Sequence, residues 1–226
     1  ALRKRDIPYR IYGGLSFYQR KEIKDILAYL RMLVNPKDEE SLKRVINYPP
    51  RGIGQTTVDK LVVGSKQHNL PLFETIVRAK ELQLPLNAGT LLKLNEFATL
   101  MQRFQIENES LNAFEITDLV TKKIGLVQEL KKDATPEGIA RIENIEELLN
   151  GIRDFTEGQE ELADATGSLS EFLEDVALAT DLDKDDDPNS DRVALMTIHL
   201  AKGLEFPYVF IVGLEEDLFP SAISLN

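Results

Sequence analysis

The feature that most constrains the fold is a change of hydrophobic period along the chain. Between residues 38 and 180, apolar residues recur every three or four positions, as on the buried face of a helix. A β-branched and aromatic segment at residues 9–12, and continuous apolar runs at 193–199 and 208–212 that are typical of buried parallel strands, indicate strands outside this stretch. The pattern predicts a mostly α fold, in which a helical domain is inserted into an α/β domain whose two parts lie together in space.

Local signals divide the middle of the chain into separate helices. Residues 22–34 carry apolar side chains on one helical face. Thr56 or Thr57 can cap a later helix through its hydroxyl group. A threonine followed by proline at 135–136 and a capping box at 168–171 mark two further helix starts. We therefore expect several helices joined by short connections.

Composition narrows the classes of function. There is no cysteine and there are only two histidines, so we expect neither disulfides nor a bound metal. The net charge of −11 counts against a generic nucleic-acid binder. The charge is uneven, because residues 2–31 carry eight Lys and Arg against three Asp and Glu, whereas residues 157–191 carry thirteen acidic residues and one Lys. No apolar run approaches the roughly 20 residues that span a bilayer, so we expect a soluble, cytoplasmic protein.

The most specific motif is Thr-Ile-His-Leu-Ala-Lys-Gly-Leu-Glu-Phe at residues 197–206, directly after a predicted strand. Parallel strands deliver polar groups to the sheet edge where α/β proteins bind ligands. Lys202 offers charge to a phosphate, Gly203 allows a left-handed turn, and Glu205 can accept a hydrogen bond from a ribose hydroxyl. An ordinary glycine turn between strands is the alternative, and it would be favoured if only the Lys-Gly pair were present.

A second motif begins at Gly13-Gly14 and continues through Phe17, Arg20, Glu22 and Asp25. The guanidinium fork of Arg20 matches phosphate oxygens. An ion pair between Arg20 and Glu22 at a helix start is an equally good interpretation. For Glu22 and Asp25 we favour a structural role.

A third motif, Arg51-Gly-Ile-Gly-Gln-Thr56, joins two predicted helices through a tight turn. Such a turn presents backbone N–H groups and the positive end of a helix dipole to phosphate oxygens. Contacts of this kind do not depend on base sequence. Alone, a Gly-x-Gly turn is more often structural.

In this order, the three motifs resemble those of the UvrD/PcrA/Rep-like superfamily 1A DNA helicases, from motif IV near Gly13 through motif V at residues 197–206. The resemblance implies an all-helical insert with a helix-hairpin-helix-like turn, flanked by incomplete α/β RecA-like segments of the P-loop NTPase type. It places the first part of the second motor domain (2A) at residues 1–45, the insert (2B) at 46–185, and the return to the motor domain at 186–226. Motif VI is expected to follow Asn226 in a longer protein.

The resemblance also assigns roles to single residues. It implies ATP contacts at Lys202, Gly203 and Glu205; single-strand contacts at Tyr18, Arg20, Thr197 and His199; and duplex contacts at Arg51, Gly52, Gly54, Thr56 and Lys60. Leu200 and Asp217 depart from the family pattern, which has a small residue and a glycine there. The sequence lacks the Gly-x-x-x-x-Gly-Lys-Ser/Thr phosphate loop. We therefore expect no complete catalytic site, no ATP hydrolysis and no bound cofactor in this segment alone.

The parent protein implied by the resemblance is a 3′–5′ DNA helicase that uses ATP and Mg²⁺ in DNA repair or replication. Its partner is DNA, at the single strand and the duplex junction, and the insert can also contact proteins. Two alternatives stay open. One is a non-enzymatic helical protein-interaction module, which the net charge of −11 favours. The other is the same region of a helicase–nuclease.

Overall fold

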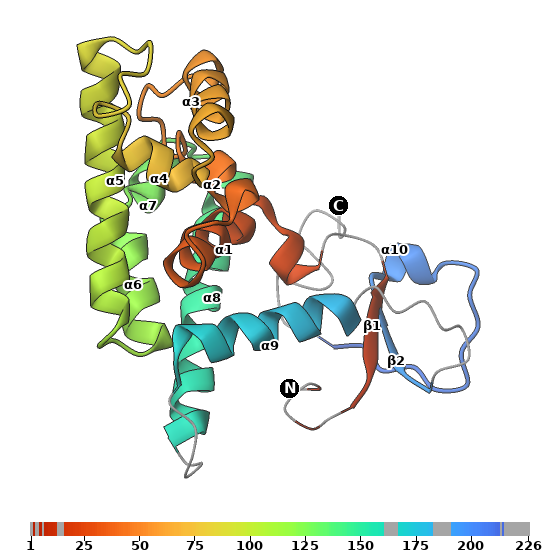
Figure 1. Cartoon of the computed structure of the whole chain (residues 1–226). Coiled ribbons are helices and arrows are strands. Elements are labelled where there is room, and N and C mark those ends of the chain that lie inside the picture. The colour runs from red at the N-terminus through yellow and green to blue at the C-terminus, as the bar shows by residue number, and fades with distance from the viewer. Residues whose placement is uncertain are drawn as a thin grey trace. The chain divides into compact units, whose positions relative to one another are not determined.

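The computed structural model describes Leu2, Arg5, residues 7–12, 16–160, 167–182 and 191–212, and Leu214 (Figure 1). The chain separates into two compact units. One consists of Ala1–Gly14 with Asp187–Asn226, and the other of Leu15–Asp186. Among the described helices, none combines the length and apolar character needed to cross a membrane.

The smaller unit contains two parallel strands from opposite ends of the chain. Strand β1 (Tyr9–Tyr12) pairs with β2 (Val193–Met196), with Tyr9 opposite Val193 and Tyr12 opposite Met196. The backbone N–H of Val193 extends the pairing by donating to the Pro8 carbonyl at 2.9 Å. The expectation that the two strand-like ends of the sequence lie together is confirmed.

Of two further strand predictions in this unit, one is confirmed in part and one is wrong. The strand expected at residues 193–199 ends at Met196, because Thr197 begins the short helix α10 (Ile198–Ala201) and its hydroxyl accepts from the Leu200 N–H. Residues 208–212 form no strand, and the Phe210 side chain is 89% exposed. An apolar run shows only that a segment can be buried. A strand also needs a neighbour to complete its hydrogen bonds, and no third strand lies beside β1 or β2 within the described residues.

The described secondary-structure elements of the larger unit are all helices. A short 3₁₀ helix at Phe17–Gln19 comes first. The α-helices that follow are α1 (Lys21–Val34), α2 (Glu39–Val45), α3 (Gln55–His68), α4 (Leu72–Val77), α5 (Ala88–Asn108), α6 (Ala113–Lys123), α7 (Leu126–Leu130), α8 (Pro136–Glu160) and α9 (Leu169–Leu182). The mostly α class predicted from the period is confirmed.

The hydrophobic core of this unit is built around α1. The side chains of Ile23, Ile26, Tyr29 and Leu30 are fully buried, and α1 contacts α2, α5, α6, α8 and α9. Figure 1 shows α1 among the other helices of the unit. We expected the insert to begin at residue 46, whereas the compact helical unit begins at Leu15 and includes α1 and α2. The assignment of these residues to a motor domain or an insert stays a prediction.

Two of the predicted helix starts are present. The Ser168 N–H donates to the Glu171 carboxylate at 2.9 Å and the Glu171 N–H donates to the Ser168 hydroxyl at 3.3 Å, which completes the capping box of α9. At the start of α8, the Thr135 hydroxyl accepts from the Gly138 N–H at 3.2 Å. The capping residues in the sequence were therefore sufficient to locate the starts of both helices.

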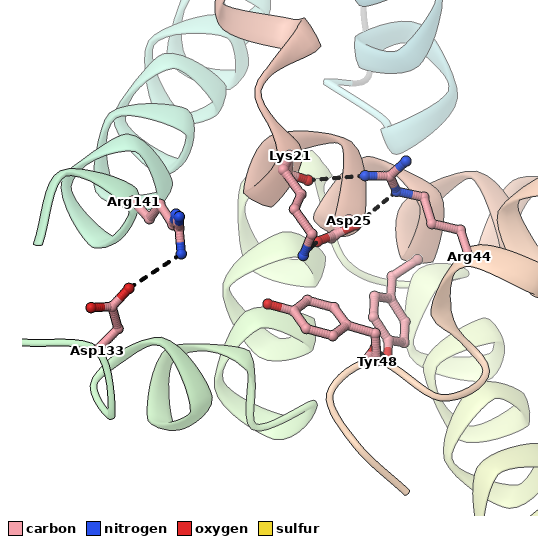
Figure 2. Close-up of polar contacts among 7 residues, drawn as sticks. Lys21, Asp25, Arg44, Tyr48, Asp133 and Arg141 are labelled. Atoms are coloured by element: carbon pink, nitrogen blue, oxygen red, sulfur yellow. Dashed lines mark hydrogen bonds and ion pairs between the residues drawn. The ribbon is translucent and has the colours of Figure 1, made fainter. Parts of the chain in front are cut away.

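Asp133 strengthens the start of α8. Its carboxylate accepts from the N–H and the hydroxyl of Thr135 at 3.1 and 2.6 Å, and it pairs with Arg141 one turn into the helix at 3.4 Å (Figure 2). The hydrogen bonds from Thr135 and the charge of Arg141 lower the pKa of the Asp133 carboxyl group. A negative charge at this end is also favourable to the helix dipole.

Candidate nucleic-acid interface

The Gly-Ile-Gly turn between α2 and α3 is held from inside the protein. The Asn47 side-chain oxygen accepts from the N–H groups of Arg51 and Ile53 at 3.0 and 2.9 Å. The Ile53 side chain is 1% exposed and anchors the turn in the core. Gly52 has a φ of +69°, a left-handed conformation that glycine adopts without strain.

The turn leads directly into the N-terminus of α3. Gly54 is the N-cap residue, and no side chain caps the helix. The capping role predicted for Thr56 or Thr57 is therefore wrong, because both lie inside the helix. The first N–H groups of an α-helix have no partner within the helix, and no atom lies within 4 Å of the space a Gly54 side chain would fill. The exposed Thr56 lies in this first turn. This arrangement can bind an anion such as a phosphate oxygen.

Arg51 is largely engaged with the protein itself. Its Nη1 donates to the carbonyl oxygens of Val45 and Pro49 at 3.0 and 3.2 Å. Its guanidinium group lies over the rings of Phe97 and Tyr29, 5.4 and 5.7 Å from their centroids. The resemblance assigned Arg51 to the duplex. In the structure its contacts support the segment that carries the turn.

Tyr29 completes this support from α1. Its hydroxyl donates to the Tyr48 carbonyl at 2.6 Å and lies 3.2 Å from the Val45 carbonyl. Burial raises the pKa of the Tyr29 hydroxyl to about 12, and the nearby positive charge of Arg51 opposes this shift. The hydroxyl therefore stays protonated and keeps its role as a donor at physiological pH.

Two lysines lie near the turn, and only one of them was predicted. Lys60 lies on α3 and donates to the Pro85 carbonyl at 2.9 Å. Lys93 lies on α5, and its Nζ lies 3.4 Å from the Gly52 carbonyl oxygen. Lys93 and Gly52 are 41 residues apart, so no local sequence pattern could link them.

The predicted single-strand residues Tyr18 and Arg20 are half-buried at the start of α1. The Tyr18 ring packs edge-on against the Phe17 ring, with 5.4 Å between the two ring centroids. Arg20 donates to the side-chain oxygen of Asn144 on α8, and the Asn144 amide donates to Glu22 at 2.7 Å. The two interpretations of Arg20 were a phosphate contact and an ion pair with Glu22. In the structure, Asn144 lies between the two charged groups.

Asp25 joins α1 to α2. Its carboxylate is almost fully buried and accepts from the Arg44 Nε at 2.7 Å and from the Lys21 Nζ at 3.3 Å (Figure 2). Arg44 also donates to the Lys21 carbonyl at 3.2 Å, and the Lys21 ammonium group lies 3.9 Å from the centroid of the Tyr48 ring. These contacts fit the structural role that we favoured for Asp25.

The motif V residues lie in the smaller unit and are exposed. Thr197 caps α10, which contains His199. Lys202 and Glu205 flank Gly203, whose φ of +85° gives the left-handed turn that the sequence suggested. The strand β2 delivers this turn at its carboxyl end, as predicted for a ligand-binding edge.

The two departures from the family pattern are Leu200 and Asp217. Leu200 is 45% exposed. Asp217 lies outside the described residues.

The helical unit carries the Gly-Ile-Gly turn, and β2 leads into Thr-x-His-x-Ala-Lys-Gly, so both units contain motifs that resemble those of superfamily 1A DNA helicases. The family model of the UvrD-like helicase C-terminal domain matches residues 1–226, and the chain belongs to this family. It is 42% identical to the ATP-dependent DNA helicase PcrA of Staphylococcus aureus strain Mu50 over 96% of its own length. It is 40% identical to the PcrA of Staphylococcus epidermidis strain ATCC 12228 over the same share. The chain spans 29% of the length of these relatives. The predicted membership of the UvrD/PcrA-like helicases is confirmed.

Proposed function

We propose that this chain is part of an ATP-dependent 3′–5′ DNA helicase of the cytoplasm that acts in DNA repair or replication. The helical unit contacts duplex DNA at the junction, independently of base sequence. The motif V unit supplies one side of an ATP–Mg²⁺ site, through Lys202, Gly203 and Glu205. Because the phosphate loop is absent from the sequence, the 226-residue chain does not hydrolyse ATP alone.

The observation that carries the duplex proposal is the geometry of the turn at residues 52–54. Asn47 and the buried Ile53 fix the turn from the protein side. The start of α3 has no side-chain cap, because its N-cap residue is Gly54. Backbone N–H groups presented in this way suit phosphate oxygens, and such contacts fix register without reading bases. Gly52, Gly54 and Thr56 are the residues we assign to this contact, with Lys60 and Arg51 beside them.

The single-strand proposal rests on the resemblance of the sequence motifs. Thr197 and His199 lie at the carboxyl end of β2. Tyr18 and Arg20 lie at the start of α1 in the helical unit, where Arg20 would exchange its Asn144 partner for a phosphate. We keep all four residues as single-strand contacts, to be tested separately from the duplex contact.

The test is binding of the 226-residue chain to a labelled duplex with a 3′ single-stranded tail, followed as salt is raised. The informative variant is Thr56→Glu, because a carboxylate in the first turn of α3 favours the helix dipole but repels phosphate. Thr99→Glu is the matched control, since Thr99 is an exposed threonine on α5 and the charge change is the same. Gly54→Ala is a milder variant, with open space for its methyl group.

We expect salt-sensitive binding of the wild type, a loss of binding in Thr56→Glu and little change in Thr99→Glu. Equal losses in both threonine variants would remove the role of the α3 turn. No wild-type binding at low salt would overturn the duplex proposal. The acidic protein-interaction module, favoured by the net charge of −11, would then be the better function for the helical unit.

A further inference from the structure

The surface beside the Gly52–Gly54 turn contains a positive charge that the sequence motifs do not include. Lys93 projects from α5 so that its Nζ lies 3.4 Å from the Gly52 carbonyl oxygen. A side chain built on Gly52 would place its Cβ 2.5 Å from the same Nζ. Glycine at position 52 therefore leaves room for the Lys93 ammonium group directly against the turn.

This position matters because a tight turn exposes carbonyl oxygens as well as N–H groups. The Gly52 carbonyl presents partial negative charge, which would repel an approaching phosphate. The Lys93 ammonium group can offset that charge and offer its remaining N–H donors to solvent, since it has three donors in all. Lys93 is exposed, so it keeps the freedom to meet a ligand.

Arg51 cannot fill the same role without leaving its own partners. Its Nη1 is shared by the Val45 and Pro49 carbonyls, and its guanidinium plane covers the buried Phe97 ring. Arg51 and Lys93 line the same surface hollow of about 220 Å³, together with Glu96, Phe97 and Leu100. Of the two cations in the hollow, Lys93 is the one whose charged end lies against the turn.

We infer that Lys93, rather than Arg51, is the side-chain cation that contacts the DNA backbone beside the turn. This inference rests on the proposed duplex contact and extends that surface from the α3 start onto α5. Glu96 lines the same hollow one helical turn after Lys93, and its carboxylate opposes an incoming phosphate. The hollow therefore pairs one residue that strengthens phosphate binding with one that weakens it.

The test measures affinity and salt dependence for a blunt duplex and for a single strand of equal length. Lys93→Gln removes the charge, Lys93→Arg restores it, and Glu96→Gln removes the opposing carboxylate. Lys66→Gln is the matched control, because Lys66 is exposed in the last turn of α3, about 18 Å along the helix from Gly54. Urea unfolding of each variant separates a binding effect from a folding effect.

We expect Lys93→Gln to weaken duplex binding roughly two- to fivefold, as for loss of an exposed ion pair. The slope of log affinity against log salt should become shallower by about 0.9, the value for one lost phosphate contact. Lys93→Arg should recover both quantities, Glu96→Gln should tighten binding, and Lys66→Gln should leave the slope unchanged.

An unchanged slope in Lys93→Gln, or an equal loss on the single strand, overturns the assignment of Lys93 to the duplex. If Thr56→Glu abolishes duplex binding while Lys93→Gln keeps the wild-type slope, the proposed function stands and this inference fails. If the wild type binds no duplex, both fail together.

Discussion

Tyr29 and Arg51 stabilise the segment before the turn from two sides. The Tyr29 hydroxyl bonds the Tyr48 carbonyl, and Arg51 bonds the carbonyls of Val45 and Pro49. Carbonyl groups in an irregular, partly buried segment must be paired, because an unpaired buried acceptor is costly. A side chain that looks available for DNA in the sequence can thus be committed to the backbone of its own loop.

Tyr29→Phe tests this support and its pH dependence. At neutral pH we expect a loss of about 1–3 kcal/mol in the free energy of unfolding, because the Tyr48 carbonyl loses its donor. The pKa of Tyr29 is about 12 in the fold against 10.0 as the ordinary value. The stabilisation is therefore complete below pH 10 and is lost as pH rises towards 12. In that window the unfolded chain has already released the proton.

Urea unfolding of wild type and Tyr29→Phe between pH 8 and pH 12 measures how much the Tyr29 hydroxyl stabilises the fold at each pH. The difference between the two free energies should shrink by about 1.4 kcal/mol per pH unit above pH 10. A difference that stays constant over that range would show that the Tyr29 hydroxyl is not buried as described.

Asn47 offers a way to separate the shape of the turn from its charge. Asn47→Ala removes the acceptor for two N–H groups and should destabilise the protein by about 0.5–1.5 kcal/mol, since water can reach this exposed position. Asn47→Asp keeps the acceptor and adds a negative charge near the turn. It should unfold at nearly the wild-type urea concentration yet bind duplex DNA more weakly. Full duplex affinity in a folded Asn47→Asp protein would argue against phosphate contact at this turn.

At the scale of elements, the junction of α1 and α2 depends on one buried carboxylate. Asp25 is 3% exposed, and its Oδ1 lies 2.7 Å from the Arg44 Nε. In the Glu39–Lys43 pair on α2, by contrast, both side chains are exposed. A charge pair with one buried partner is screened less by solvent than an exposed pair. Both pairs have their cation on α2, so they form a matched comparison of a buried and an exposed carboxylate.

Double-mutant cycles with Asp25→Asn and Arg44→Gln should give a coupling energy of about 1–3 kcal/mol. The cycle with Glu39→Gln and Lys43→Gln should give less than about 0.5 kcal/mol. Chemical denaturation of each variant provides these values. Equal coupling in both cycles would mean that burial of Asp25 adds nothing to the connection between α1 and α2.

Helices could be predicted from sequence where local signals were strong. The helical period of apolar residues located α1, and the Thr135-Pro136 pair located α8. The Ser168–Glu171 capping box located α9. The N-cap residue predicted for α3 was wrong, because a glycine can serve as N-cap without any side-chain signal. The strand predicted at 208–212 failed because burial depends on neighbours that the segment itself does not encode. For the same reason, the position of Lys93 against Gly52 could not be predicted.

At the scale of the whole molecule, the candidate contacts are divided between the two units. The duplex candidates Gly52, Gly54, Thr56 and Lys93 belong to the helical unit, and the motif V residues belong to the smaller unit. Every buried apolar residue of the core lies between Ile23 and Val176. The helical unit therefore contains the complete described core, and its stability should not depend on the strand pair.

A chain of residues 15–186 should consequently fold alone. We expect its far-ultraviolet circular dichroism to show a cooperative urea transition with the midpoint of the 226-residue chain, because every described core residue lies within this segment. It should also keep the wild-type affinity for blunt duplex DNA, while Thr56→Glu in the shorter chain should abolish it. A cooperative transition without duplex binding would move the DNA contact to the motif V unit. A broad, non-cooperative transition would instead show that the helical unit needs residues 1–14 or 187–226 for its stability.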